Sequence, residues 1–340
     1  MSRWRNDPEA AAARLIAGRL DKIDVGGRVL LANPPAGGEL RARVAERGDR
    51  CDVWVRRLGD NGGGVEARPW PPLGPFDTVL LRLPPAKEEQ TMAAHAALSV
   101  LAPTGRLIVY GGNEEGIRSS VAMLARLSGE VETLFARGHG RVLALRRPAD
   151  LSPIRGALSS WRTTTRVVIG DIARPWVSYP GVFAAGRIDP ATRLLIGVLP
   201  ALPRKARLLD FGCGSGLIGA SALAQMPGVC LDMLDNDTVA LAAARENVAE
   251  GRPILAARLA DAPAGYDAIL SNPPLHRGIA EDHRSLNELI TEAPRHLTAR
   301  GVLQIVVQRR VGVLPLLQRR FARVEVAAQN EGYRVVRAER

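Results

Sequence analysis

The tetrapeptide Ser271-Asn272-Pro273-Pro274 combines residue types that can hold an amine. It follows a short apolar run, Tyr266 to Leu270, which predicts a buried strand. Proline has no N–H for a sheet ladder, so the strand must end here and the chain must leave at the carboxyl edge of the sheet. Open α/β folds bind their ligands at this edge. The side-chain carbonyl of Asn272 and the backbone carbonyl of Pro273 would there form two acceptors suited to a planar NH2 group.

An NH2 group on a purine or pyrimidine ring is a weak nucleophile, because its lone pair is delocalised into the ring. Two fixed acceptors can hold its hydrogens while the nitrogen pyramidalises and directs its lone pair at an incoming methyl group. We therefore predict a catalytic role for Asn272, Pro273 and Pro274, with no metal required. The alternative is a strand-ending turn in which Asn272 caps the next segment.

A second candidate lies upstream, where a predicted strand, Arg207 to Phe211, runs into the turn Gly212-Cys213-Gly214-Ser215-Gly216 and then into a helix. Glycines let a backbone approach a ligand closely, and a helix start offers free N–H groups. Asp235 ends the next strand, 19 residues past Gly216, where an acid can accept both hydroxyls of a ribose. Asp261, after a short third strand, is placed to accept from an adenine amino group.

These glycines also fit the dinucleotide pattern G-x-G-x-x-G, from Gly214 to Gly219, so the turn alone leaves a nicotinamide enzyme open. The Asn-Pro-Pro end of the fourth strand argues against that alternative. We also find no pair of residues suited to relay a hydride on the same face.

The chain repeats itself. Strands and helices alternate in the same order in both halves, and two pairs of segments match: Phe76 to Leu80 with Tyr266 to Leu270, and Leu101 to Val109 with Leu297 to Ile305. This predicts an α/β protein of two tandem Rossmann-like domains, each a mostly parallel, doubly wound sheet with a closing antiparallel strand pair.

The two copies differ where chemistry would occur. The first copy has Asn33-Pro34-Pro35 in place of an evenly spaced glycine turn, and Leu83 rather than Asn precedes its paired prolines. A polar segment, Arg146 to Pro153, predicts the boundary. We expect residues 1–150 to be a degenerate copy that supports folding or holds RNA, and residues 151–340 to be the catalytic domain.

Two motifs together, Leu209 to Gly216 and Ser271 to Pro274, resemble those of class I S-adenosylmethionine-dependent methyltransferases that modify exocyclic amines. With the duplication, Pro180 to Phe183 followed by Asp189 is similar to the bacterial ribosomal RNA guanine-N2 methyltransferases of the small-subunit RsmC type. The resemblance implies methylation of a guanine N2 amine in ribosomal RNA, with the small ribosomal subunit favoured, and S-adenosyl-L-methionine as cofactor. It implies a cofactor cradle of Asp210, Gly212, Gly214 and Gly216, ribose binding by Asp235, adenine contact by Asp261, and target-amine binding by Asn272 and Pro273.

The motif departs from the family at Leu275, where an aromatic residue usually follows the prolines. Two alternatives therefore stay open. One keeps the cofactor and methylates a DNA amine or a protein glutamine. The other is a non-catalytic RNA-binding or ribosome-assembly protein.

Composition agrees with a polyanionic partner. The net charge is +11, and clustered cations drive association with nucleic acids. Three cysteines are too few and scattered for a disulfide framework or a zinc site. No apolar run reaches the roughly 18 residues that span a bilayer, and the N-terminus lacks a signal-peptide pattern. We expect a cytoplasmic protein with no membrane partner.

Overall fold

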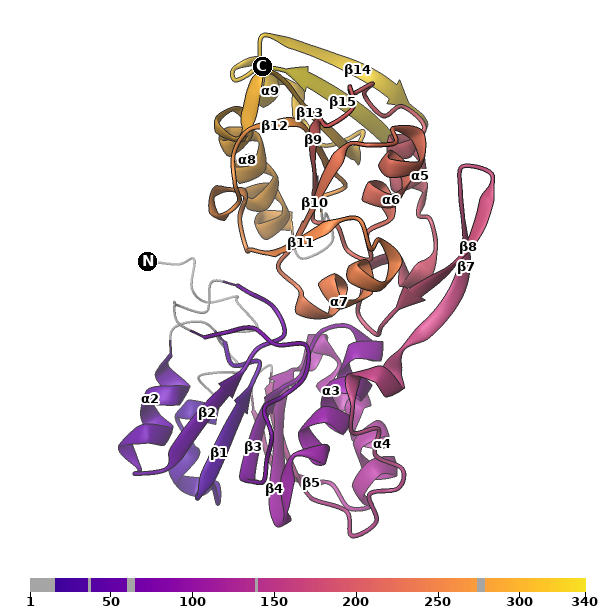
Figure 1. The fold of residues 1–340 in the computed structure, drawn as a ribbon. Helices are drawn as coiled ribbons and strands as arrows, with labels where there is room; N and C mark the ends of the chain where they lie inside the picture. Colours follow the sequence, from indigo (N-terminus) through magenta and orange to yellow (C-terminus); the bar gives the residue numbers. More distant parts are fainter. Residues whose placement is uncertain (1–15, 36–37, 60–64, 138–139, 274–278) are drawn as a thin grey trace. The chain divides into compact units, whose positions relative to one another are not determined.

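The computed structural model describes residues 16–35, 38–59, 65–137, 140–273 and 279–340, and the chain forms two compact units, Met1–Arg162 and Thr163–Arg340 (Figure 1). The polar segment near residue 150 that we predicted as the boundary remains with the first unit, because the residues after it pack there. His95 Nδ1 accepts a hydrogen bond from the Arg155 N–H at 3.0 Å, and the ring of Trp161 meets His95 edge-on.

The first unit is built on a six-stranded sheet in the order β2-β1-β3-β4-β6-β5, in which β1 to β4 are parallel and the last two strands are antiparallel to their neighbours. Its elements are η1 (Leu20–Lys22), β1 (Arg28–Ala32), α2 (Glu39–Glu46), β2 (Arg50–Trp54), β3 (Phe76–Arg82), α3 (Lys87–Ser99), β4 (Leu101–Gly112), η2 (Asn113–Glu115), α4 (Ile117–Ser128), β5 (Glu132–Arg137), β6 (Gly140–Arg146) and η3 (Leu158–Trp161).

The second unit is built on a seven-stranded sheet in the order β11-β10-β9-β12-β13-β15-β14, parallel except for β15. A separate hairpin, β7–β8, precedes it. The elements are β7 (Thr163–Ile169), β8 (Ile172–Ser178), η4 (Phe183–Gly186), α5 (Pro190–Ile196), β9 (Arg207–Phe211), α6 (Leu217–Gln225), β10 (Cys230–Asp235), α7 (Thr238–Asn247), β11 (Arg252–Leu255), η5 (Leu259–Asp261), β12 (Tyr266–Ser271), α8 (Ile279–His296), β13 (Leu297–Gln308), α9 (Leu314–Gln318), β14 (Arg323–Gln329) and β15 (Tyr333–Glu339).

Apart from β11, the two sheets share one strand order, which confirms the predicted fold class. The duplication extends to side chains at the amino ends of the strands. In the first unit Asp77 Oδ2 accepts the backbone N–H of Arg28, whose guanidinium lies 4.2 Å from the Phe76 ring centre. In the second unit Asp267 and Arg207 repeat the first contact at 2.9 Å, and Arg207 lies 4.7 Å from the ring centre of Tyr266.

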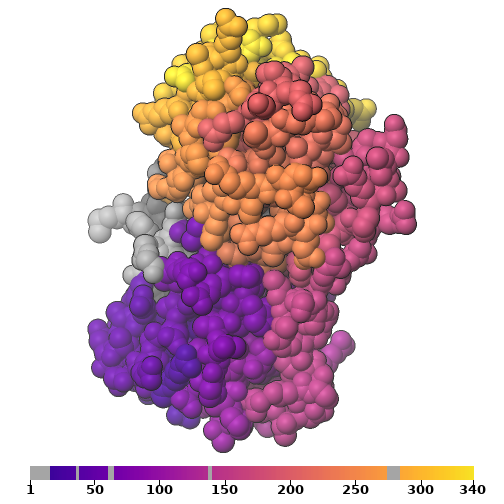
Figure 2. All heavy atoms as spheres, viewed as in Figure 1, coloured from indigo at the N-terminus to yellow at the C-terminus, as the bar shows by residue number. Residues whose placement is uncertain are grey.

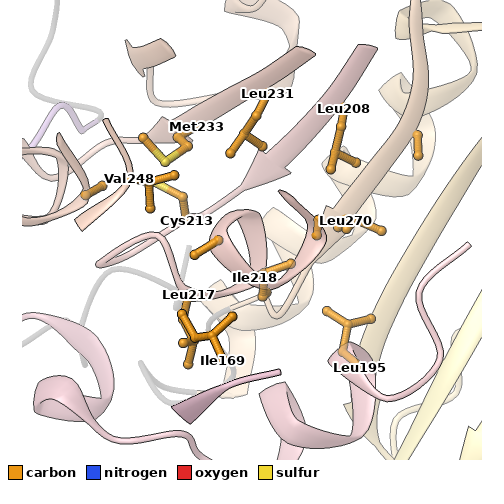
Figure 3. Packing of buried hydrophobic residues seen from close by; sticks show 14 of the residues in the cluster. Ile169, Leu195, Leu208, Cys213, Leu217, Ile218, Leu231, Met233, Val248 and Leu270 are labelled. Carbon is orange, nitrogen blue, oxygen red and sulfur yellow. The ribbon is translucent and has the colours of Figure 1, made fainter. Parts of the chain in front are cut away.

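Both faces of the second sheet are buried, as a doubly wound fold requires. Successive residues of β9 alternate between the faces, since Leu208 belongs to the core under α5, α6 and α7, and Leu209 to the core under α8 and α9. Figure 1 shows α8 on one side of this sheet and α5 and α6 on the other. Figure 3 shows the first of these cores, in which strand residues such as Leu208 and Leu270 face Ile218 of α6. Packing on both faces holds the strand ends in place.

The β7–β8 hairpin is a narrow antiparallel ribbon whose turn contains Gly170. Its side chains stand out from the body of the second unit in the space-filling view (Figure 2), and Val168 and Ile172 near the turn are more than half exposed. Within the described part of the chain, every helix is too short or too polar to span a bilayer.

Candidate active site at the carboxyl edge of the second sheet

The predicted site residues meet where the strand order reverses. From β9 the chain builds outward to β10 and β11, and then returns to place β12 and β13 on the other side of β9. Leu270 of β12 pairs with Asp210 of β9, and Ser271 Oγ donates to the Phe211 carbonyl at 2.8 Å. The glycine turn and Asn272 therefore start from adjacent strand ends, at the topological switch point where such sheets bind ligands.

The glycine turn is held in a conformation that needs glycine. Gly212, Gly214 and Gly216 have φ values of 70°, 55° and 88°. The Gly212 N–H donates to the Leu234 carbonyl at 2.8 Å, which ties the turn to β10. A Cβ built on Gly212 or Gly214 would meet nothing within 4 Å, so the turn has open space beside it. Gly216 is the N-cap of α6 and offers no side chain to the N–H groups of the first turn.

Replacing Gly216 with alanine is expected to destabilise the fold more than the same change at Gly212. A positive φ strains alanine at both positions by about 1–2 kcal/mol. At Gly216 the new Cβ would also lie 2.9 Å from Val248 Cγ2, and overpacking adds about 1–3 kcal/mol. Gly212→Ala should instead chiefly weaken binding of the predicted cofactor. Urea unfolding of both variants measures the difference, and equal losses would contradict this account.

Asp210 has a buried carboxyl group, of which one oxygen accepts a hydrogen bond from a described residue and the other does not. Its Oδ2 accepts the Gly219 N–H at 2.9 Å, which supplies the cap that Gly216 cannot. Its Oδ1 is buried and has no hydrogen-bond partner among the described residues. Burial raises the pKa of Asp210 to about 7; the Gly219 hydrogen bond opposes this shift, and the nearby Asp235 carboxylate adds to it. A buried acceptor without a donor beside an open glycine turn fits a bound polar, cationic ligand such as S-adenosylmethionine.

Asp235 is brought directly onto the glycine turn. It is the last residue of β10, its Oδ2 accepts the Gly214 N–H at 2.8 Å, and its Oδ1 accepts the Asp237 N–H at 2.9 Å. Asp237 in turn caps α7 through the Val239 N–H. The carboxylate is therefore fixed beside the space where the ribose was predicted.

The Asp261 carboxylate is paired with a near neighbour in the sequence. Asp261 ends η5, six residues after the last residue of β11, and its carboxylate forms an ion pair with Arg258 at 3.1 Å. The side chain is 42% exposed. Among the described residues its carboxylate bonds to Arg258, and the adenine contact stays a prediction.

Asn272 is half-buried immediately after β12, and the structure shows which end of its amide is held. The Nδ2 atom donates to Thr192 Oγ1 at 2.9 Å and lies 3.5 Å from Asp189 Oδ2. The Oδ1 atom is on the opposite branch of the amide group. Pro273 is buried, whereas Pro274 and Leu275 lie outside the described residues.

Sequence reasoning did not find Thr192 as a partner of Asn272. The only local signal is Asp189-Pro190, which is typical of a helix start. It likewise missed how the glycine turn is supported from β8. Asn247 binds both the N–H and the carbonyl of Val177 and donates to the Ser215 carbonyl, while Trp176 Nε1 donates to Ser215 Oγ at 3.0 Å.

The strand register identifies the equivalent positions in the first unit. Thr78 and Ala268 pair with the residues directly after Gly105 and Gly301, so the two are counterparts. Counting four residues on from each places Arg82, not Leu83, at the position of Asn272. The Arg82 guanidinium is buried, donates to the Leu83 carbonyl at 2.7 Å and pairs with Glu115. The same counting places two buried apolar residues, Leu31 and Val55, where the second unit has Asp210 and Asp235.

Two family models match the chain. Residues 175–337 match the family model "Methyltransferase small domain", and residues 58–136 match "Methyltransferase small domain N-terminal". The fold and the site thus define a methyltransferase of the Rossmann-like type.

The more specific matches cover more than nine tenths of both chains. The chain is 33% identical to ribosomal RNA small subunit methyltransferase C of Stutzerimonas stutzeri, covering 93% of this chain and 95% of that protein. It is 32% identical to the protein of the same name from Ectopseudomonas mendocina, over 92% and 95% of the two chains. The chain belongs to the ribosomal RNA small subunit methyltransferase C family.

A solved structure shares the whole fold. The T. thermophilus 16S rRNA N2 methyltransferase RsmC, in complex with AdoMet and guanosine, superposes with a TM-score of 0.83 over 99% of this chain and 93% of its own, at 22% identity.

Proposed function

We propose that this chain transfers a methyl group from S-adenosylmethionine to the exocyclic N2 amine of a guanine in the ribosomal RNA of the small subunit. The family relationship and the ligands of the T. thermophilus structure support this substrate and cofactor. The observation that carries the proposal is the position of Asn272, whose strand end is hydrogen-bonded to that of the glycine turn while its amide nitrogen is turned toward α5.

The residues present suit this chemistry. Asp210, Asp235 and the glycine turn would hold the cofactor, which supplies an electrophilic methyl group. Asn272 Oδ1 and the Pro273 carbonyl accept the two hydrogens of the target amine and orient its lone pair. The carbon–nitrogen bond forms as the carbon–sulfur bond breaks, and the excess proton on the amine passes to water. Because the target base must reach this edge of the sheet, it is taken out of its stack.

The decisive experiment is mass spectrometry of nucleosides from small-subunit ribosomal RNA, comparing a strain that lacks this protein with its parent. Loss of one N2-methylguanosine, restored by the gene, is the expected result. Purified protein offered small subunits, naked RNA and DNA with labelled S-adenosylmethionine then defines the substrate. Labelling of DNA or of a protein glutamine, or no labelling at all, would contradict the proposal and favour an alternative.

Each chain is expected to bind one molecule of S-adenosylmethionine. The first unit has Leu31, Val55 and Arg82 at the positions of Asp210, Asp235 and Asn272, so it lacks the acceptors that a second site needs. This favours a supporting or RNA-holding role for that unit. Isothermal titration calorimetry measures the stoichiometry. A value near two would contradict this assignment, and no saturable heat would indicate a non-catalytic protein.

A further inference from the structure

The Asn272 amide is anchored at the capped start of α5. Asp189 is the N-cap of α5, and its Oδ1 accepts the N–H groups of Ala191 and Thr192 at 3.0 and 3.3 Å. Pro190 follows as the first helical residue, where its fixed φ suits a helix. Leu195 of the same helix is completely buried in the core under the sheet. The oxygen atoms that face Asn272 therefore belong to a rigid element.

The orientation of that amide decides whether the site can work. An asparagine side chain presents an acceptor oxygen on one branch and a donor NH2 of similar size on the other. If the Asn272 side-chain amide were rotated by 180°, its NH2 group would face the target amine. Both groups would then be hydrogen-bond donors, and the amine would have no acceptor. Nothing in the shape of the side chain excludes this turn, so the choice has to come from its partners.

Thr192 and Asp189 contribute differently to the orientation of the Asn272 amide. The Thr192 hydroxyl is close, at 2.9 Å, but a hydroxyl can donate as well as accept, so it fixes position without selecting an orientation. A carboxylate can only accept. Asp189 Oδ2, at 3.5 Å from Asn272 Nδ2, therefore favours the orientation with the nitrogen toward α5. The Asn272 carbonyl is then the group left for the substrate.

We infer that Thr192 and Asp189 are positioning residues for methyl transfer, which hold the Asn272 amide with its carbonyl available to the target amine. The inference rests on the proposed function. It assigns to the segment before the glycine turn a role in catalysis that does not depend on touching either reactant.

Thr192 allows a test with two matched variants. Thr192→Val keeps the shape and removes the hydroxyl, whereas Thr192→Ser keeps the hydroxyl and removes a methyl group. We expect the single-turnover rate to fall about tenfold or more in the valine variant and to stay within about threefold of wild type in the serine variant. Calorimetric affinity for S-adenosylmethionine should stay unchanged in both. If Thr192 served packing alone, the order would reverse, because valine fills the buried position better than serine.

Asp189→Asn supplies an independent measurement. Asparagine caps a helix as well as aspartate, so thermal stability should change little. It replaces an obligatory acceptor by an amide that can turn a donor toward Asn272, so the single-turnover rate should fall while cofactor affinity is retained.

The outcomes separate the two proposals. Wild-type rates in Thr192→Val and Asp189→Asn, in a chain that methylates guanine, would overturn the positioning role alone. A wild-type chain that binds S-adenosylmethionine but methylates no guanine would overturn both. If Thr192→Val does not fold, the rate of Asp189→Asn decides the question, because that variant preserves the helix cap.

Discussion

Replacing Asn272 with alanine is expected to lower the single-turnover rate of methyl transfer by about 100-fold to 1,000-fold, the usual cost of removing one preorganised group that stabilises a transition state. The variant loses the side-chain acceptor for the target amine and keeps only the Pro273 carbonyl. Binding of S-adenosylmethionine should persist, because the Asn272 side chain bonds to Asp189 and Thr192, whereas Asp210 and Asp235 are held by the backbone of the glycine turn and of α6. Rapid-quench methylation of ribosomal RNA and calorimetry measure the two effects separately.

Asn287→Ala is the matched control, since Asn287 lies on the exposed face of α8 and the same atoms are removed. It should leave rate and affinity unchanged. Full methylation by Asn272→Ala with intact cofactor binding would remove Asn272 from the mechanism.

Replacing Asp210 with asparagine is expected to make the cofactor-free protein more stable at pH 8, by on the order of 2–4 kcal/mol. Burial raises the pKa of this carboxyl from 3.8 to about 7, so the fold disfavours its charged form. The unfolded chain loses this proton near its ordinary pKa, and the folded chain holds it until about pH 7. The stability of the wild type therefore falls between these values as pH rises, and the neutral amide avoids that loss.

Urea unfolding at pH 4, 6 and 8 tests the direction of this pH dependence. The difference in free energy of unfolding between Asp210→Asn and wild type should be small at pH 4 and widen up to pH 8. A gap that is constant with pH would show that the carboxyl is not the titrating group.

The same variant should bind S-adenosylmethionine at least tenfold more weakly, because hydrogen bonds to charged groups contribute about 1.5–3 kcal/mol. Asp267→Asn is the control, since Asp267 caps the amino end of β9 at the opposite edge of the sheet. It should leave cofactor affinity unchanged. If Asp210→Asn is more stable than wild type but binds S-adenosylmethionine more weakly, the Asp210 carboxylate serves cofactor binding at a cost in stability.

The sequence by itself determined the two tandem Rossmann-like domains, the shared order of their elements along the chain and the two turns that carry the site. Glycine has no Cβ and can adopt the positive φ found at Gly212, Gly214 and Gly216, and paired prolines must end a strand, so both turns are compatible only with the residue types present. The segments that repeat between the halves also predicted the duplication, because the spacing of apolar residues within each segment indicates whether it forms a strand or a helix.

Only the tertiary structure decided which side chains meet at the carboxyl edge of the second sheet. Thr192 and Asn272 are 80 residues apart, and their contact exists because α5 packs against β13 and β15 of the same sheet. The strand register likewise showed that Arg82 replaces Asn272 in the first unit, whereas counting from the prolines had indicated Leu83. A backbone turn is governed by neighbouring atoms within a few bonds, but a hydrogen bond between distant residues depends on how whole elements pack, and local sequence patterns do not contain that information.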